Sequence, residues 1–392
     1  MIKRIADNIT SPLGFTTVDN YAALKLGRSA LRRYEDKWNL PEPFVASLFS
    51  DEQWECVKKD VEDVNVECGY NLPRATMLAI RSVKAAAEQV SIDLSAKNVL
   101  FVISTTKGNV DLLSCGHETD VLRSQTLIGE IGSMVARYFK AHNTPIVVSN
   151  ACISGLHAQI TAKRALEFGH YDYAVVVGVD VQSKFIVSGF QSFKALSPDA
   201  CRPFDKNRVG LNLGEAAATV IYQRVGDGQD ECKDLDAWYA VDGVVRNDAN
   251  HISGPSRTGE GSYRALRAVL RHVEHTEDLA LINVHGTSTL YNDEMESIAI
   301  GRTGLIDVPV NTLKGYYGHT MGAAGVLEAV LSMQSIDDHT ILGTRGFSEM
   351  GVSRPVNVTA ANRTTDKQAF VKLLSGFGGC NAAMLFTKGG KL

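Results

Sequence analysis

The 392-residue sequence predicts an α/β protein built from two similar halves. Short segments that are apolar almost throughout alternate with segments of helical spacing, which is typical of sheets covered by helices on both faces. The same order of strands and helices then occurs a second time along the chain. A single sheet that used all of these strands would exceed the roughly ten that open sheets usually reach, so we expect two halves packed face to face.

In the first half, four segments are predicted to be strands and two to be helices. The strands are expected at residues 99–104, 145–149, 173–179 and 216–223, and the helices at 122–142 and 156–168. The first 95 residues are less regular and are expected to decorate this half. Helical spacing there covers residues 21–34 and 74–90, and the second of these begins after Pro73.

The second half repeats this order. Its strands are expected at residues 279–284, 308–311, 370–374 and 382–387, and its helices at 292–301 and 322–335. The last strand of each half follows a turn that contains Gly and Asn, residue types that permit tight turns. A polar segment at 227–233 separates the halves, so we predict an N-terminal domain over 1–226 and a C-terminal domain over 234–392.

Composition argues against several classes of function. With 40 Lys and Arg against 44 Asp and Glu, the formal net charge of −4 leaves no basic excess for a nucleic-acid partner. The longest apolar runs have about seven residues, far below the roughly 20 that a membrane span requires. No apolar core of a signal peptide follows Met1, so we expect a cytoplasmic protein. Seven cysteines without a CxxC pair argue against a disulfide framework and a zinc site.

Cys152 is the first candidate for chemistry. It lies between the predicted strand at 145–149 and the predicted helix at 156–168, where unpaired backbone N–H groups and the helix dipole favour the thiolate form of its side chain. The alternative is a buried structural thiol, which is the more common role of a cysteine. The other six cysteines lack this position and are interpreted as structural.

Two histidines, His285 and His319, provide a second signal. Each lies beside small residues in a predicted strand-to-helix turn of the second half. Either one alone would more often be a surface histidine or a hydrogen-bonded core histidine. Because ligands of α/β sheets bind outside the carboxyl ends of the strands, we expect the two imidazoles and the Cys152 thiol to converge.

Seven motifs, in this order, resemble the β-ketoacyl-acyl carrier protein synthases, specifically the elongating type with a Cys-His-His triad. They are residues 150–155 (NACISG), 193–196 (FKAL), 202–208 (RPFDKNR), 214–216 (GEA), 285–289 (HGTST), 314–325 (KGYYGHTMGAAG) and 376–381 (GFGGCN). The resemblance covers the chain from about residue 95 to its end. It implies the thiolase fold, in which two similar α/β halves form five αβαβα layers, and this agrees with the duplication.

The resemblance also implies roles for individual residues. Cys152 matches the nucleophile that carries the acyl group, and His285 and His319 match the two imidazoles of the condensation site. Lys314 matches the active-site lysine, and Glu328 matches the acidic residue that accompanies it. The alternative for this last pair is a purely structural ion pair that orders the loop around His319.

Three further positions are implied near the reacting groups. Phe377 matches a gating phenylalanine whose backbone N–H joins that of Cys152 in the oxyanion hole. The glycines on both sides of Phe377 favour a loop that swings over a simple core position. Thr287 and Thr289 resemble positions that line the phosphopantetheine and malonyl path.

The implied activity is a decarboxylative Claisen condensation that extends an acyl group on Cys152 by two carbons from malonyl-acyl carrier protein. The expected partners are acyl carrier protein and an identical or related synthase subunit, and no cofactor or metal is expected beyond the phosphopantetheine of the carrier. Phe193 belongs to an apolar segment, 185–193, that we expect to line the acyl pocket at the subunit interface. Three cationic residues either dock the acidic carrier or form only a solvated charged face: Arg202, Lys206 and Arg208.

Two other functions compete with this interpretation. A thiolase condenses without decarboxylation and normally pairs its nucleophile with one histidine and a second cysteine, so Lys314 and His319 argue against it. A noncatalytic chain-length partner of a synthase usually lacks the nucleophile, so Cys152 argues against that role. An initiating synthase would normally have Asn in place of His319.

Four departures from the family pattern indicate a diverged member. The first strand is shortened to residues 1–10, Ile153 follows the nucleophile in place of Ser or Thr, Cys380 replaces a common Thr, and residues 104–109 replace a more Gly-rich segment. None of these changes removes a catalytic group. They favour a specialised pathway, such as aryl polyene or polyketide synthesis, over housekeeping fatty acid synthesis.

Overall fold

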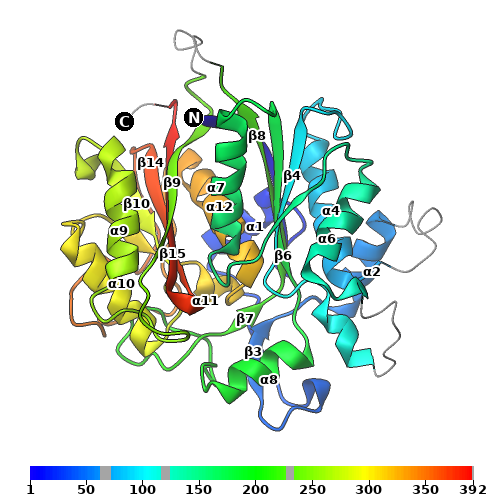
Figure 1. The fold of residues 1–392 in the computed structure, drawn as a ribbon. Coiled ribbons are helices and arrows are strands. Elements are labelled where there is room, and N and C mark those ends of the chain that lie inside the picture. The colour runs from blue at the N-terminus through cyan, green and yellow to red at the C-terminus, as the bar shows by residue number, and fades with distance from the viewer. Residues whose placement is uncertain (62–71, 116–123, 227–233, 391–392) are drawn as a thin grey trace.

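The computed structural model describes residues 1–61, 72–115, 124–226 and 234–390, which form a mixed α/β structure (Figure 1). Its main sheet has ten strands in the order β11-β10-β14-β15-β9-β1-β8-β6-β4-β5. The central pair, β1 and β9, is joined at two positions, where Ile2 pairs with Ala240 and Lys3 with Tyr239. The two expected halves are therefore present as two five-stranded half-sheets, but these join edge to edge at one short junction, so the expectation that the strands would not form one sheet is wrong.

The two half-sheets have the same topology, which confirms the duplication predicted from the sequence. The first consists of β1 (Ile2–Thr10), β8 (Ala216–Arg224), β6 (Tyr173–Asp180), β4 (Val99–Ser104) and β5 (Ile146–Val148). The second consists of β9 (Trp238–Asn247), β15 (Cys380–Lys388), β14 (Ala369–Gly376), β10 (Leu279–Asn283) and β11 (Val310–Asn311). In each, neighbours among the first three strands are antiparallel and neighbours among the last three are parallel.

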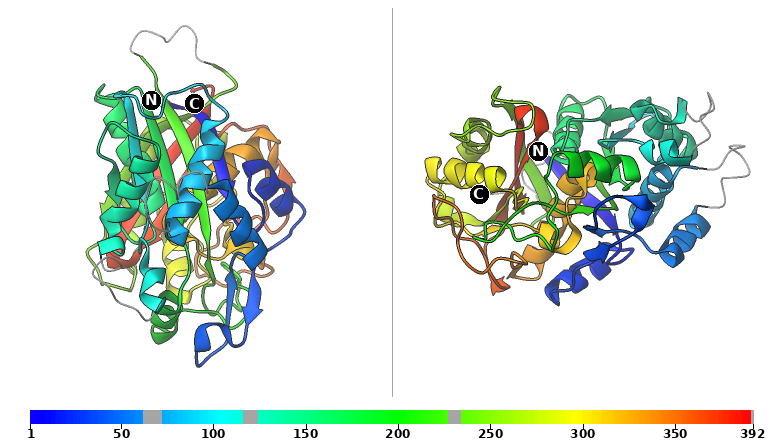
Figure 2. Two further views of the ribbon diagram at one scale, coloured as in Figure 1. Left: turned by 90° about the vertical axis from the view of Figure 1, so that its right-hand side faces the viewer. Right: turned by 90° about the horizontal axis from the view of Figure 1, so that it is seen from below.

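Helices cover both half-sheets and fill the space between them. The central helices α7 (Ser154–Glu167) and α12 (Ala324–Asp337) contact each other, and each contacts strands of both halves (Figure 1). On the outer face of the first half-sheet lie α4 (Arg74–Ala87) and α6 (Ile128–Tyr138), and over the second lie α9 (Glu260–Val269) and α10 (Leu290–Arg302) (Figure 2). This is the five-layer αβαβα arrangement of the thiolase fold.

The central helices meet through glycines in their first turns. A Cβ atom on Gly325 would lie 2.2 Å from the backbone nitrogen of Leu156, and one on Gly155 would lie 2.7 Å from the carbonyl oxygen of Gly322. Only residues without a side chain allow the two backbones to approach this closely. The chain segments that precede α7 and α12 are therefore brought side by side.

The remaining elements surround these layers. They are α1 (Thr17–Lys25), β2 (Arg32–Tyr34), β3 (Phe44–Ser47), α2 (Asp51–Asp60), α8 (Lys184–Ser192), β7 (Leu213–Gly214), α11 (Lys314–Tyr317), β12 (Thr340–Ile341) and β13 (Arg363–Thr364), with short 3-10 turns that include Met321–Ala323 and Phe377–Gly379. Strands β2, β3 and β7 form a small sheet that lies near α8 (Figure 1). Among the described residues, no helix is both long enough and apolar enough to cross a membrane.

Several elements differ from the sequence prediction. The helix predicted at 21–34 is wrong in its second part, because α1 ends at Lys25 and residues 32–34 form β2. Gly27 adopts a positive φ of 71° just beyond the helix, which ends its regular backbone. Strand β9 and helices α8 and α9 were not predicted. The expected domain boundary at 227–233 and the start of the helix predicted from 122 lie outside the described residues.

Candidate active site

Three reactive side chains meet where the halves join. Cys152 lies two residues before α7, His285 follows β10, and His319 precedes α12. The Cys152 Sγ atom and one ring nitrogen of each histidine all lie within 4.8 Å of one another. The two imidazole rings are 5.0 Å apart at their centroids and nearly perpendicular, at 80°. The convergence expected from the sequence is therefore present in the structure.

The turn that presents Cys152 is held by its own hydrogen bonds. The Ser154 hydroxyl donates to the Ala151 carbonyl at 2.6 Å and accepts from the Asn150 N–H at 2.8 Å. Ala151 adopts a positive φ of 45°, a strained conformation for a residue with a side chain. The backbone N–H groups of Phe377 and of Cys152 itself lie close enough to the thiol to lower its pKa. Two donors are thus already in place for negative charge that develops next to the thiol.

Burial raises the pKa of the Cys152 thiol above its ordinary value. Lys314, Lys107 and the two N–H groups act in the opposite direction but do not outweigh the loss of solvation. In the resting protein the protonated thiol therefore predominates at neutral pH, which corrects the thiolate expected from its place at a helix N-terminus. The sequence could not show the degree of burial that decides this balance.

His319 is held as a neutral hydrogen-bond donor. Its Nδ1 accepts from the Met321 N–H at 3.2 Å, so the ring proton lies on Nε2, which is buried and has no hydrogen-bond partner among the described residues. Burial, and then Lys314, lower the pKa of His319 well below its ordinary value. The sequence predicted a strand before His319, but the structure has the short helix α11 there. The backbone N–H of His319 donates to the Asn212 carbonyl at 2.7 Å.

His285 is fixed through its backbone by a buried carboxylate. Glu296 of α10 accepts from the N–H groups of His285 and Gly286, each at 2.7 Å. Burial raises the pKa of Glu296 to about 7, and burial followed by Lys314 lowers the pKa of His285 well below its ordinary value. Both imidazoles are therefore neutral at pH 7. Glu296 was not identified from the sequence.

Behind the imidazoles lies a buried cluster of two lysines and one glutamate. Lys314 Nζ is 2.7 Å from Glu328 Oε1, as the sequence analysis expected for this pair. A second lysine, Lys372 of β14, lies 2.6 Å from Glu328 Oε2 and was missed, although a lysine inside an apolar strand is a visible signal. Burial alone would raise the pKa of Glu328, but the two ammonium groups hold it below its ordinary value. Neither Lys314 nor Glu328 is among the described residues that line the cavity over the thiol.

That cavity has a volume of about 430 Å³ and leads from the surface to the thiol. The predicted residues Phe193, Thr287, Thr289 and Phe377 all line it. The two threonine hydroxyls are hydrogen-bonded to each other at 3.0 Å. Exposed apolar side chains surround its outer part: Phe193, Val209, Leu290 and Tyr291. The site thus has an apolar entrance and a polar floor, as in pockets that bind a chain with a reactive end.

Phe377 lines the cavity from a glycine-rich turn. Its ring lies 6.2 Å from that of Phe190 and 6.0 Å from that of Phe193, and 39% of the residue is exposed. Gly378 and Gly379 have positive φ angles of 81° and 70°, which a residue with a side chain would adopt only with strain. Gly376 packs against the backbone of Cys152, because a Cβ there would lie 3.0 Å from its nitrogen.

A buried aspartate links the two halves beside the site and was also missed. Asp180, the last residue of β6, accepts from the Gly322 N–H at 2.7 Å and from the side chains of Thr105 and Thr106 at 2.7 and 2.8 Å. Gly322 lies between His319 and α12. The carboxylate therefore holds the His319 segment of the second half against the ends of two strands of the first half.

The predicted carrier-docking cations have different environments. Arg208 is buried and donates to the carbonyls of Asp205 and Gly351, so it braces the loop and cannot dock a partner. Lys206 is exposed and paired with Glu349, and Arg202 is exposed. The expectation that these three cations dock the carrier or form a solvated charged face is thus wrong for Arg208.

The remaining described cysteines differ from Cys152. Cys380 is buried and donates to the Phe377 carbonyl at 3.1 Å, and burial raises its pKa to about 12. Cys201 is buried as well, and Cys56 is exposed and away from the cavity. The Cys-His-His set offers ligand types that zinc accepts, but an added cation would face the buried ammonium groups that already lower the pKa of both histidines.

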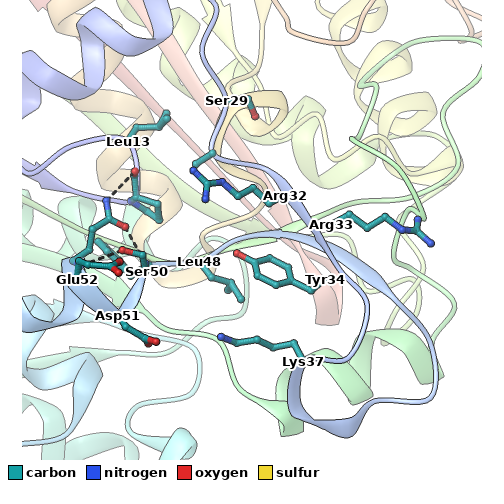
Figure 3. Close-up of a pocket in the computed structure, with 14 residues that line it drawn as sticks. Leu13, Ser29, Arg32, Arg33, Tyr34, Lys37, Leu48, Ser50, Asp51 and Glu52 are labelled. Carbon is teal, nitrogen blue, oxygen red and sulfur yellow. Dashed lines mark hydrogen bonds between the residues drawn. The ribbon is translucent and has the colours of Figure 1, made fainter.

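A larger cavity, of about 630 Å³, lies beside the N-terminal end of α2. Figure 3 shows Arg32, Tyr34 and Lys37 on one side and Asp51 and Glu52 on the other. None of the described residues that line it is a cysteine or a histidine. Size alone therefore does not identify the site, and the chemistry lies in the smaller cavity.

Comparison with known proteins gives consistent matches. Residues 5–227 match the family described as beta-ketoacyl synthase, N-terminal domain, and residues 240–348 match beta-ketoacyl synthase, C-terminal domain. The 3-oxoacyl-(acyl-carrier-protein) synthase 2 of Vibrio cholerae is 27% identical over 406 residues, which cover 96% of each chain. The tetracenomycin polyketide synthase ketoacyl synthase alpha subunit of Streptomyces glaucescens is 31% identical over 255 residues, 62% of this chain and 59% of that one.

Solved structures match over nearly the whole chain. A beta-ketoacyl synthase from Burkholderia phymatum has a TM-score of 0.84 at 24% identity and covers 99% of both chains. A ketosynthase from Xenorhabdus doucetiae, solved in complex with its chain length factor, has a TM-score of 0.83 at 23% identity and covers 99% of this chain and 98% of that one. At this identity the likeness establishes the fold.

Proposed function

Because the chain belongs to the β-ketoacyl synthase family of condensing enzymes, we propose that it extends an acyl chain by decarboxylative condensation with malonyl-acyl carrier protein. The observation that carries the proposal is the meeting of one thiol and two neutral imidazoles within 4.8 Å at the floor of an apolar-rimmed cavity. The substrates would arrive on the phosphopantetheine of the carrier, whose extended arm suits a narrow path past Thr287 and Thr289.

In the first half-reaction, the Cys152 sulfur attacks the thioester of an acyl-carrier protein. The carrier leaves as its free thiol and takes up the proton that the Cys152 thiol loses, so charge is conserved. Negative charge builds up on the acyl oxygen in the tetrahedral intermediate. The N–H groups of Cys152 and Phe377 can bind this oxygen, and one such donor is typically worth about 3 kcal/mol in the transition state.

In the second half-reaction, malonyl-carrier protein binds and loses carbon dioxide, which leaves an enolate on its thioester oxygen. The Nε2–H of His319, a residue that lines the cavity, has no partner among the described residues and can bind this oxygen, with His285 as the second donor. The enolate carbon then attacks the acyl-Cys152 carbonyl, a carbon-carbon bond forms, and the Cys152 thiolate leaves. This thiolate is finally reprotonated, which restores the resting thiol.

Mass spectrometry of the intact protein tests the proposal directly. After mixing with a panel of acyl-carrier proteins, the wild-type protein should gain the mass of one acyl group, and the preferred acyl group identifies the substrate. The Cys152→Ala protein should gain none, whereas Cys380→Ser should behave like the wild type. Acylation that persists in Cys152→Ala would overturn the assignment of the nucleophile and would favour a thiolase-like use of Cys380.

The same experiment under native conditions tests the partner. We propose a dimer, with the exposed side chains of Phe185 and Phe193 at its interface. A mass of twice 42.5 kDa indicates a homodimer, and co-purification with a related synthase subunit indicates a heterodimer. An active monomer at micromolar concentration would contradict this part of the proposal.

Two exposed cations, Lys194 and Arg202, are candidates for docking the acidic carrier. The free thiols of Cys201 and Cys380 suit a cytoplasmic location.

The two imidazoles are expected to contribute no acid limb to decarboxylation near pH 6.5, because their pKa values lie well below their ordinary value of about 6.5. The groups that titrate between pH 6 and 8 are instead Glu296, with a pKa of about 7, and Lys372, with a pKa of about 8. A histidine with an ordinary pKa would become charged as pH falls through 6.5, and its activity would change there. The measurement is release of labelled carbon dioxide from malonyl-carrier protein by Cys152→Gln, which cannot form the acyl-enzyme. An acid limb near pH 6.5 that persists in Glu296→Gln, in which the titrating carboxyl is removed, would show that at least one imidazole is normally solvated.

A further inference from the structure

The buried side chain of Lys372 makes more contacts than an ion pair requires. Lys372 lies in the middle of β14, between β10 and β15, and is 0% exposed. Its Nζ is 2.6 Å from Glu328 Oε2 and lies 3.2 to 3.3 Å from three backbone carbonyl oxygens, those of Asn283, Val284 and Leu373. Four oxygen atoms thus surround a single ammonium group.

These contacts link Lys372 to the chain segments that carry both histidines. Two of the carbonyls belong to the residues immediately before His285, whose own N–H is held from the other side by Glu296. Through Glu328, Lys372 is also linked to Lys314, the first residue of the short helix that ends just before His319. One positive charge therefore connects the segments that carry the two imidazoles.

The charge is costly to keep there. Burial lowers the pKa of Lys372 to about 8 even though Glu328 raises it, which shows that loss of solvation dominates. A buried ion costs several kcal/mol before pairing, and an apolar side chain would suit the surrounding strand, whose residues Phe370 to Leu374 are otherwise apolar. A charge retained at such a position is expected to have an electrostatic role that an apolar side chain could not have.

We propose that the Lys372 ammonium is a tethered internal cation that fixes the two imidazoles relative to each other, and that Lys372 is thus a positioning residue for decarboxylation. The inference rests on the proposed function, because decarboxylation is the step that uses both imidazoles. A carboxylate and several carbonyl oxygens are the ligands that proteins also offer to hard cations. Lysine supplies the same charge from within the chain.

The donor set suggests a test by replacement of the cation. In Lys372→Ser, the space left by the side chain is bordered by Glu328 Oε2 and three carbonyl oxygens, so it should accept a potassium or ammonium ion. In a buffer whose only cation is tetramethylammonium, which is too large for the space, we expect decarboxylation to fall about 10- to 100-fold, as is usual when a group behind a catalytic site is lost. Acylation of Cys152, which does not need the imidazole pair, should change less than about threefold.

Addition of potassium or ammonium chloride should restore decarboxylation by Lys372→Ser at least about tenfold. The wild-type protein should not respond to these salts, because its own ammonium group occupies the space. Lys372→Met fills the space without charge and should remain impaired in every salt. Lys163→Met is the matched control, since Lys163 is another buried lysine paired with a glutamate but its partner, Glu167, is remote from the cavity.

Several outcomes would overturn the inference. They are wild-type decarboxylation by Lys372→Ser in tetramethylammonium, equal recovery of Lys372→Ser and Lys372→Met on adding salt, and equal loss in both half-reactions. If Lys372→Ser does not fold, Lys372→Gln, which retains an N–H donor but no charge, takes its place, and wild-type activity of that variant would also contradict the role. If the wild-type protein itself does not decarboxylate malonyl-carrier protein, the proposed function fails, which is a separate result.

Discussion

His319→Ala is expected to lower malonyl decarboxylation by about 100- to 1000-fold, because it removes one of two donors to the enolate oxygen, and such a donor is worth about that factor in rate. His319 lines the cavity, and among the described residues its Nε2–H has no competing partner. His285→Ala should have an effect of similar size. Transfer of an acyl group to Cys152 should remain detectable in both variants, since that step relies on backbone N–H groups.

The two half-reactions can be measured separately. Labelled acyl-carrier protein without malonyl groups reports acylation, and labelled carbon dioxide from malonyl-carrier protein reports decarboxylation. His272→Ala is the control, because His272 is paired with Asp242 and does not line the cavity. Equal loss of both half-reactions in His319→Ala would mean that this imidazole activates the thiol as a general base. Full decarboxylation in His319→Ala would contradict the assignment of the triad.

Gly325→Ala is expected to destabilise the protein by about 3 kcal/mol or more and to abolish condensation. The added Cβ would lie 2.2 Å from the Leu156 nitrogen, and neither backbone can move without separating α7 from α12. Overpacking of a core usually costs about 1 to 3 kcal/mol, and contact with backbone places this case at the upper end. Denaturant unfolding measures the loss of stability, and the acylation and decarboxylation assays measure the loss of geometry.

Gly301→Ala provides the control for this prediction. Gly301 lies within α10, and a Cβ there would be 4.0 Å from the nearest atom. Alanine in a helix is favoured over glycine by about 1 kcal/mol, so this variant should be as stable as the wild type or more stable. If Gly325→Ala unfolds at the same denaturant concentration as Gly301→Ala, the close approach of the central helices is not needed for stability.

The strands of both halves were predictable because burial on two faces leaves a continuous apolar run. Strand β9 was not predicted in this way, because Asp242 and Gly243 interrupt its apolar run. Gly243 is there because a Cβ would lie 2.7 Å from the Ile160 side chain of α7, a contact that no local sequence pattern reveals. The first-half helix predicted at 21–34 failed for a local reason, the turn at Gly27.

The reactive residues of the site were predictable from their motifs, but the groups that support them were not. Asp180 and Lys372 each act on a backbone segment that is distant in sequence, so their partners become visible only in the fold. Glu296 lies only 10 and 11 residues after its partners Gly286 and His285, but the turn into α10 that brings them together is not visible in the sequence. The protonation state of Cys152 depends on burial by residues from both halves. Sequence position alone therefore gave the wrong direction for its pKa.

The contact between Gly155 and Gly325 separates the substrate range of the enzyme from its reaction geometry, two properties that are usually coupled. The spacing of the nucleophile and His319 is set by main-chain atoms in the first turns of two helices, not by the side chains that fill the cavity. Residues around the acyl chain, such as Phe190 and Leu211, can therefore be exchanged without changing the distance over which the new bond forms. Substrate range can diverge, or be redesigned, while the reaction geometry is inherited unchanged.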